Sequence, residues 1–342
     1  MQIVRFIRSI VLPAASLAIS LAVSAQQPYK LLDRWTIGGE GGWDYLVADA
    51  PAHRLYITHN ARVEVVDTST GKPIGAITGL HGTHGVALLP DGKLGYISDG
   101  AANQVAVFDR STLTIAATIP AGTNPDGILY EPSTATVWAF NGRSHSASVI
   151  DTTTQKVIAT VPLPGKPEFP VADGQGTIFV NIEDKNQIVC LDARTHQITA
   201  TWAAGCESPS GLAFDVTGHR LFPVCDGNKM AVVDSLTGKL LATPAIGDGP
   251  DAAGFSAAHN LAFASSGDGI LAIVDATAPN YPTLQKLATQ SSARTMTYDP
   301  ASDRIYLVAA QFGPRPAPTA QTPKPRPTVL SGSFTVLVVG RN

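Results

Sequence analysis

A short apolar motif that ends in aspartate recurs along this chain at a nearly constant interval. The steps between successive aspartates are 42, 42, 41, 42 and 41 residues, and a seventh copy, FTVLVVG, ends at Gly340. The six aspartates are Asp67, Asp109, Asp151, Asp192, Asp234 and Asp275. A period of this length, with four short apolar runs in each unit, is typical of a β-propeller blade.

The order of strands within a unit can be followed in the third copy. There DGILYEP, TVWAFN, ASVID and KVIATV supply strands a to d, from the inside outwards. The last copy has only three strands, and KLLDRWTI at residues 30–37 can supply the fourth. Pairing the first strand with the last covers two exposed sheet edges. The sequence therefore predicts an all-β, seven-bladed β-propeller with four-stranded blades, closed by an N-terminal strand that completes the last blade.

Several short stretches resemble the YVTN, or YncE-like, family of seven-bladed propellers. They are the strands LYIT, GYIS, IFVN and IYLV, the stretches GTNPDGI, GKPEF and GDGPDAA before strand a, and the VVD…TGK turns at 65–72 and 232–239. The resemblance covers residues 29–342 and implies the propeller architecture. Because the family includes surface proteins, binding proteins and members without an assigned role, it implies no single activity.

The first 25 residues have the composition of a secretory signal peptide. Arg5 and Arg8 precede an apolar run, and Val23-Ser24-Ala25 offers small residues for cleavage. The run is short for a membrane span and contains a proline. We therefore expect a periplasmic or secreted monomer without a membrane span, with residues 26–342 as one propeller domain. Its 22 basic and 27 acidic residues disfavour nucleic acid as a partner, because phosphate binding needs a basic face.

Two of the three cysteines, Cys206 and Cys225, flank a predicted hairpin, so the two ends of that segment approach each other. In an oxidising compartment a disulfide can form there. The sequence does not fix the strand register, so the bridged and the free forms both stay open. Cys190 lies in the alternating strand NQIVCLDA, where a buried, inert thiol is expected.

The start of strand a carries a polar side chain in every blade. Counted from NPDGILY at 124–130, the same position holds Asp44, His84, Asp126, Glu168, Ser210, Asp251 and Arg294. Strand a is innermost, so we expect these seven side chains, here called the mouth ring, to surround one end of the central channel. The a–b turns on the opposite face contain only routine turn residues.

Crowded carboxylates raise one another's pKa or need a cation. In the mouth ring, Arg294 lies between Asp251 and Asp44 in blade order. We expect its positive charge to offset part of the repulsion between these carboxylates. Asp126 and Glu168, on adjacent blades, have no such basic neighbour in the ring.

The b–c loops emerge on the same face as the mouth ring and add further polar side chains. Together with Glu207, from a d–a loop, the candidates are His59, Asn60, Asp99, Asn141, Arg143, Asn181, Glu183, Asp184, Asp226, Asn228 and Asp268. The combination predicts a concave polar site for a small hydroxylated or cationic molecule. The carboxylates would accept hydrogen bonds or bind a cation, and Arg294 and Arg143 would contact anionic groups.

Metal chemistry is one alternative for this site. Oxygen ligands from Asp126, Glu168 and Glu183, with Asn181, can hold Ca²⁺ or Mg²⁺. The histidines of LHGTHG, His81 and His84, could instead hold a transition metal, although no cysteine or second histidine pair supports them.

Catalysis is another alternative. In a metal-assisted lactone hydrolase or lyase, Glu168 or Asp126 would act as the base and His84 as the acid. A hydrolase pair of Ser210 and His84 is less favoured, because three blades separate them and a nucleophile needs its base within hydrogen-bond reach.

A third hypothesis is a scaffold that docks another exported protein. Blade seven carries a proline-rich insertion at 313–330, whose six prolines favour polyproline II. We expect its Arg315, Lys324 and Arg326 either to cover the acidic mouth as a lid or to belong to a solvated tether.

Overall fold

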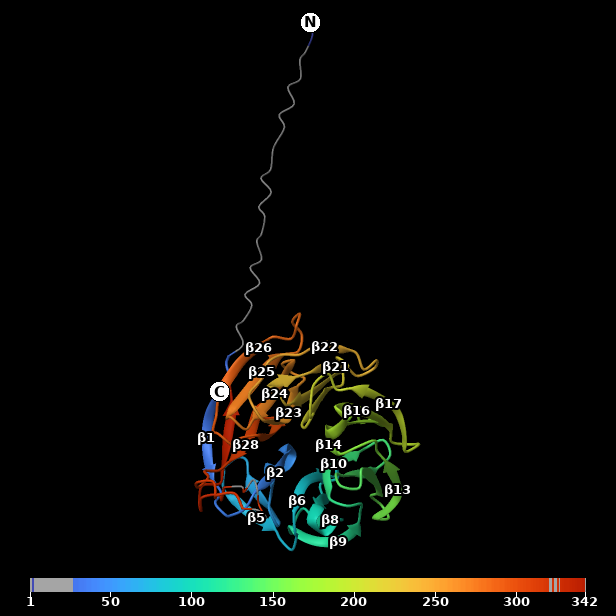
Figure 1. Cartoon of the computed structure of the whole chain (residues 1–342), viewed down its shortest axis with the longest axis vertical. Coiled ribbons are helices and arrows are strands. Elements are labelled where there is room, and N and C mark those ends of the chain that lie inside the picture. Colours follow the sequence, from blue (N-terminus) through green and yellow to red (C-terminus); the bar gives the residue numbers. More distant parts are fainter. Residues whose placement is uncertain (1, 3–26, 320–321, 323–324, 326, 342) are drawn as a thin grey trace.

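The chain folds into seven antiparallel sheets arranged as a ring around a central axis (Figure 1). The computed structural model describes residue 2, residues 27–319, residues 322 and 325, and residues 327–341. The prediction of an all-β, seven-bladed propeller is confirmed. The helices of the described residues are three single 3-10 turns, Ala50–Ala52, Gly100–Ala102 and Glu183–Lys185. Apart from Gln2, the signal peptide expected over residues 1–25 lies outside the described residues.

Each blade runs from its innermost strand outwards. Blades one and two are β2 (Trp43–Asp49), β3 (Arg54–His59), β4 (Arg62–Asp67), β5 (Pro73–Ile77), then β6 (Thr83–Leu88), β7 (Leu94–Asp99), β8 (Gln104–Asp109), β9 (Thr114–Pro120). Blades three and four are β10 (Pro125–Glu131), β11 (Thr136–Asn141), β12 (Ser146–Asp151), β13 (Lys156–Pro162), then β14 (Pro167–Ala172), β15 (Thr177–Ile182), β16 (Gln187–Asp192), β17 (Gln197–Ala203).

The other three blades follow the same plan. Blade five is β18 (Leu212–Asp215), β19 (Arg220–Cys225), β21 (Val232–Asp234) and β22 (Leu240–Ala242), and β20 (Lys229–Met230) also pairs with β19. Blade six is β23 (Pro250–Ser256), β24 (Leu261–Ser266), β25 (Ile270–Asp275) and β26 (Thr283–Ala288). Blade seven is β27 (Thr295–Asp299), β28 (Arg304–Ala309), β29 (Thr335–Gly340) and β1 (Lys30–Thr36).

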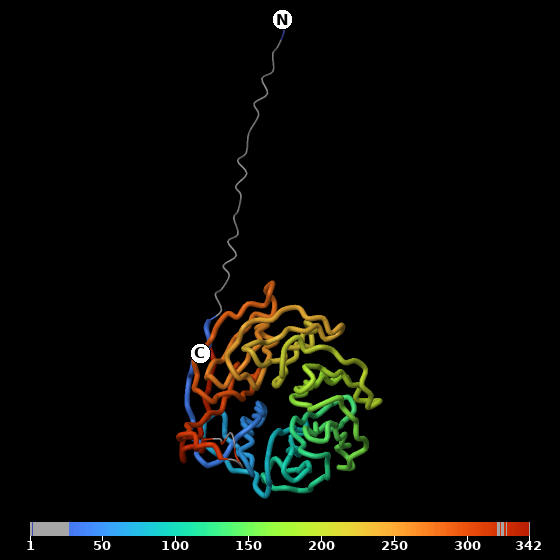
Figure 2. The backbone as a smooth tube through the Cα atoms, in the orientation of Figure 1, coloured from blue at the N-terminus to red at the C-terminus, as the bar shows by residue number. Residues whose placement is uncertain are grey.

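The two ends of the propeller meet in blade seven. Strand β1 pairs antiparallel with β29, in a register that runs from Lys30 opposite Gly340 to Thr36 opposite Thr335. Figure 2 shows the blue start of the ring lying beside its red end. The predicted closing strand therefore fills the place of strand d in the last blade.

The core lies between neighbouring blades. Strand β8 reads QVAVFD, and its four central residues, 105–108, are fully buried, because the sheet packs against another sheet on each face. Outer strands such as β9 instead alternate between exposed and more buried residues. Between blades three and four, Trp138 and Phe140 pack with Ile178 and Val180.

The aspartate that ends each repeated motif organises the turn that follows. The Oδ1 atom of Asp67 accepts hydrogen bonds from the backbone N–H groups of Ser69 and Thr70, each at 2.8 Å. The same arrangement recurs at the other members of the set, here called the turn aspartates: Asp109, Asp151, Asp192, Asp234 and Asp275. Local turn bonding therefore explains why the repeat ends in this residue.

Blade five contains a disulfide between Cys206 and Cys225, whose Cα atoms are 5.9 Å apart. The bond joins the loop before β18 to the end of β19. Of the two forms that the sequence left open, the structure has the bridged one. Cys190 is a free, buried thiol. Among the described residues, no helix has the length and apolar character needed to cross a membrane.

Candidate functional site

The mouth ring is built on irregularities at the start of the innermost strands. In blade three, Pro125 pairs with Asn141 but Ile128 pairs with Ala139, so the segment that contains Asp126 has one residue more than its partner. Such a β-bulge bends the strand and redirects a side chain. The register shifts in the same way around four other ring residues, Asp44, His84, Glu168 and Asp251. Ser210 and Arg294 come just before their strands.

Side chains of strand b hold the backbone of the mouth ring. The hydroxyls of Thr58, Ser98 and Ser265 donate to the carbonyls of His84, Asp126 and Arg294 in the next blade, and the Asn181 amide donates to that of Ser210. The blades also approach closely, since a Cβ on Gly127 would lie 2.4 Å from the Glu168 carbonyl oxygen. The ring residues are therefore fixed by their neighbours and not only by their own loops.

Blades one to three bring together Asp44, His84 and Asp126. The His84 Nδ1 atom lies 2.7 Å from Asp44 Oδ2 and 3.6 Å from Asp126 Oδ1. One ligand atom from each of the three residues lies within 4.8 Å of the others. Asp126 is only 8% exposed, and its Oδ1 atom is buried without a hydrogen-bond partner. A buried carboxylate oxygen in this state is costly unless something else pairs with it.

Blade four has an internal cation. The Lys166 ammonium contacts both Glu168 and Glu183, and it lies two residues before the ring position. The sequence analysis compared ring positions only and so did not identify this lysine, which comes from the loop before the ring position. The position two residues before the ring residue holds Gly42, Gly82, Asn124, Ser208, Gly249 and Ser292 in the other blades. Lys166 is the only charged residue at this position among the seven blades, and this difference could have identified it from the sequence.

The last ring residues pair among themselves or with the backbone. Arg294 Nη1 lies 2.8 Å from Asp251 Oδ2, as the blade order predicted. The Ser210 hydroxyl donates to the carbonyls of Pro250 at 3.0 Å and Val224 at 3.3 Å. The structure therefore does not pair Ser210 with His84, and the hydrolase pair has no geometric support.

Two aromatic rings meet beneath the mouth ring. Tyr45 from blade one and Phe169 from blade four lie edge to face, with ring centroids 5.0 Å apart. Each directly follows a ring residue, and Tyr45 is 8% exposed. Blades one and four are not neighbours, so this contact spans the central channel. The sequence reasoning missed this floor, although the other blades have Gly85, Gly127, Gly211, Ala252 and Thr295 at that position.

Burial dominates the electrostatics of the mouth ring. It raises the pKa of Asp126 to about 6 and that of Glu168 to about 8, helped by the charge of the neighbouring carboxylates. Burial also raises the pKa of Asp44 and Asp251. Burial lowers the pKa of His84, but the hydrogen bond that its Nδ1–H donates to Asp44 and the charge of Asp126 outweigh this and raise the pKa to about 9. Protonation at this site is therefore coupled among several groups.

Most of the predicted loop residues have local roles instead. Asp268 and Asp184 accept hydrogen bonds from the backbone N–H groups of Asp248 and Lys166. His81 lies 3.1 Å from Asp99 and is largely exposed. It therefore forms its own pair with Asp99, whereas His84 pairs with Asp44.

Other predicted residues lie away from the ring or are enclosed in a blade. Glu207 and Asp226 line an outer hollow of about 480 Å³ beside Cys206, and the neighbouring Asn228 is exposed. Arg143 is exposed on its loop. Asn141 is buried and donates to Ser146 and Ser148.

Little of the proposed lid can be located. Lys324 and Arg326 lie outside the described residues, and Arg315 is exposed. The ends of the insertion come together where Phe312 bridges to Val329. Phe312 packs against Trp43, with centroids 5.9 Å apart. These residues and Arg294 line a hollow of about 610 Å³ at the edge of the mouth.

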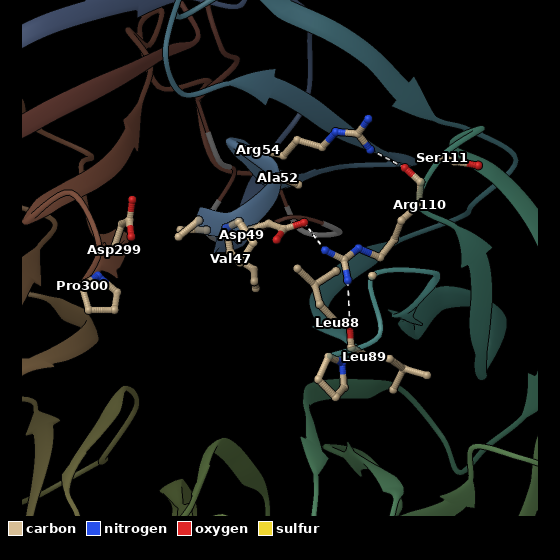
Figure 3. Close-up of a pocket in the computed structure, with 15 residues that line it drawn as sticks. Val47, Asp49, Ala52, Arg54, Leu88, Leu89, Arg110, Ser111, Asp299 and Pro300 are labelled. Carbon is tan, nitrogen blue, oxygen red and sulfur yellow. Dashed lines mark hydrogen bonds and ion pairs between the residues drawn. The ribbon is translucent and has the colours of Figure 1, made fainter.

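The opposite face is less uniform than the turn residues suggested. A hollow of about 650 Å³ lies there, and in it Arg110 contacts both Asp49 and the Leu89 carbonyl (Figure 3). Arg54 in turn donates to the Arg110 carbonyl. Arg110 and Asp49 therefore form a buried ion pair at this hollow, whereas Asp126 Oδ1 in the mouth ring has no hydrogen bond.

The sequence matches no known protein family and no curated protein. Among solved structures, the fold is similar to a chain of Kuenenia stuttgartiensis hydrazine synthase, with a TM-score of 0.69 and 14% identity over 78% of this chain and 92% of that chain. It is also similar to U3-55K, with a TM-score of 0.73 and 9% identity over 90% of this chain and 98% of that chain. At these identities the likeness extends to the β-propeller fold alone.

Proposed function

We propose that this protein is an exported, YncE-like β-propeller that binds a small cationic or hydroxylated ligand, or a divalent cation, at the mouth ring. The observation that carries the proposal is the buried, unpartnered Oδ1 atom of Asp126. Buried polar atoms are nearly always hydrogen-bonded, so an exception at the mouth of a channel favours a missing ligand. The YncE-like repeats and the Cys206–Cys225 disulfide support an exported protein, since disulfides persist in oxidising compartments.

The charge balance of the site favours a positively charged ligand. Five acids, Asp44, Asp126, Glu168, Glu183 and Asp251, face three basic residues, His84, Lys166 and Arg294. Asp44 and His84 are about a quarter exposed, so the site is open to solvent from the mouth. The Tyr45–Phe169 contact gives it a floor. We therefore expect a ligand to enter this site from the mouth of the channel.

The test is a thermal-shift screen of the chain from residue 26 onwards. The probes are CaCl₂, MgCl₂, MnCl₂ and ZnCl₂ with EDTA controls, and choline, putrescine and glucose. We expect at least one probe to raise Tm, because a ligand that binds only the folded state stabilises it. The double variant Asp126→Asn/Glu168→Gln should remain folded and lose the shift.

The matched control is Asp109→Asn/Asp192→Asn, which changes two turn aspartates and should keep the response. A flat response of the wild-type protein to every probe would contradict the proposal. If binding of a protein partner were lost on deleting residues 314–327 and unaffected by the double variant, the scaffold hypothesis would replace it.

A further inference from the structure

The two halves of the mouth ring differ in what they leave unpaired. Lys166 contacts Glu168 and Glu183, so those acids already share a cation. On the other side, His84 Nδ1 is hydrogen-bonded to Asp44 at 2.7 Å and lies 3.6 Å from Asp126 Oδ1. The buried carboxylate oxygen that still lacks a hydrogen bond therefore lies beside Asp44 and His84.

Their spacing suits a small metal ion. Ligand atoms around tetrahedral Zn²⁺, with bonds of about 2.0–2.2 Å, lie roughly 3.4 Å apart. Here the His84 Nδ1 atom is 2.7 Å from Asp44 and 3.6 Å from Asp126, and all three ligand atoms lie within 4.8 Å. Shifts of well under 1 Å would equalise the two distances from the histidine.

The three side chains are also held in place. Asp44, His84 and Asp126 stand on bulges of adjacent blades, and Thr58 and Ser98 bind the backbone of the latter two. The edge of the His84 imidazole that carries Nε2 packs against Gly100. A Cβ atom on Gly100 would lie 2.7 Å from Nε2. The Nδ1 atom of His84 is therefore the one directed at the carboxylates.

From this arrangement we infer that Asp44, His84 and Asp126 bind a first-row divalent metal ion of the Zn²⁺ class, through one imidazole nitrogen and two carboxylate oxygens. Binding releases to solvent the proton that His84 Nδ1 shares with Asp44. The inference rests on the proposed function and names its ligand. Imidazole suits Zn²⁺ and its first-row neighbours, whereas Ca²⁺ takes six to eight oxygen ligands. Three protein ligands leave a position open for water or a substrate group.

This set replaces the oxygen-only set of Asp126, Glu168 and Glu183 that the sequence suggested. Glu168 and Glu183 are held by Lys166 and stand beside the ion without binding it. Tyr45, on the floor, is close enough to the acids for their charges to raise its pKa further above the value set by burial.

The experiment is isothermal titration of the chelator-stripped, full mature chain with ZnCl₂, together with zinc K-edge absorption spectra. We expect one ion per chain and a first shell of nitrogen and oxygen without sulfur. His84→Gln and Asp126→Asn should each weaken binding at least about 100-fold, since even outer-shell changes cost about 10- to 100-fold. Glu183→Gln should weaken binding about tenfold or less, because Glu183 pairs with Lys166 beside the site and is not itself a ligand.

His81→Gln is the matched control, because it removes an exposed histidine three residues away on the same loop and should leave zinc binding unchanged. Circular dichroism and Tm of each metal-free variant establish that it is folded. Zinc binding that survives His84→Gln but is lost in Glu183→Gln would overturn the inference and leave the proposed function standing. If the protein bound choline, putrescine or Ca²⁺ in an Asp126-dependent way but did not bind zinc, the inference would also be overturned and the proposed function would stand. No binding of any probe would overturn both.

Discussion

Two sets of carboxylates recur around this propeller, and they behave in opposite ways. The turn aspartates lie at the surface, and hydrogen bonds from the turn that follows lower their pKa. The carboxylates of the mouth ring are buried, and their pKa is raised. Both sets come from the same repeat. A regular spacing alone therefore does not distinguish a structural acid from a functional one.

The difference lies in where the partners come from. Asp234 takes its hydrogen bonds from Leu236 and Thr237, two and three residues away, so every copy of the turn behaves alike. Asp126 instead has its ion-pair contact with His84, which lies 42 residues earlier in the adjacent blade. Four predictions use this contrast, from the largest expected effect to the smallest.

Asp126→Asn is expected to weaken ZnCl₂ binding at least about 100-fold without lowering the Tm of the metal-free protein. Burial raises the pKa of Asp126 to about 6, so above that pH its charge costs stability in the folded state, and a neutral amide removes that cost. Titration calorimetry and thermal unfolding with EDTA check the two parts. A loss of several degrees in Tm would make Asp126 a structural residue like the turn aspartates.

Lys166→Gln is expected to reduce the free energy of unfolding by about 1–3 kcal/mol at pH 8, between the values for exposed and buried ion pairs. Glu168 and Glu183 would lose their common cation, so CaCl₂ should then stabilise the variant more than the wild type. Denaturant unfolding with and without CaCl₂ measures both effects. Lys185→Gln is the control, since Lys185 contacts only the exposed Asp184, at 3.4 Å.

The third prediction concerns pH, with EDTA present. Folding raises the pKa of Glu168 from 4.5 to about 8, mainly through burial, so between these values the folded state binds more protons than the unfolded state. The contribution of Glu168 to the stability of the folded state is therefore greatest below pH 4.5 and is lost as pH rises towards 8.

Glu168→Gln should remove more than about 1 kcal/mol of this decline between pH 5 and 8, since one pKa unit corresponds to about 1.4 kcal/mol. Denaturant unfolding at pH 5, 6.5 and 8 measures the slope. Asp192→Asn should leave it unchanged, because the lowered pKa of Asp192 places its effect at acidic pH. Parallel curves for wild type and Glu168→Gln would contradict the burial of a charged Glu168.

Asp234→Ala is expected to have the smallest effect, a loss of less than about 1 kcal/mol, since water can replace an exposed turn acceptor. The loss should shrink as pH falls through the lowered pKa of Asp234, because protonation removes the same interaction in the wild type. ZnCl₂ binding should not change. The same unfolding and titration measurements apply, and a binding defect would remove the distinction between the two sets.

The period in the sequence was sufficient to predict the blades and the closing strand β1. It also predicted the pair of Arg294 with Asp251, because those positions are adjacent in blade order. These features depend only on counting residues within a repeat. The repeat is regular because each blade must bury the same two faces against its neighbours.

What the sequence did not predict depends on side-chain directions across the channel. Lys166 lies outside the repeating position, and the contact of Tyr45 with Phe169 joins blades one and four. Neither follows from a period, because a β-bulge turns the side chains of strand a by an amount that spacing does not encode. Blade order likewise suggested a site with oxygen ligands from Asp126 and Glu168. It did not predict that Glu168 would form an ion pair with Lys166.

The hydrogen bonds between β1 and β29 also set the order in which the protein can finish folding. A segment made near the start must wait, unpaired, until residues 335–340 have been synthesised, and contacts this distant in sequence form slowly. This pairing lies within blade seven, where Arg294 directly precedes β27, and β1 leads along the chain into β2 of blade one, which carries Asp44. We therefore expect a weakened closing strand to disturb the positions of Asp44 and Arg294 before the other blades unfold.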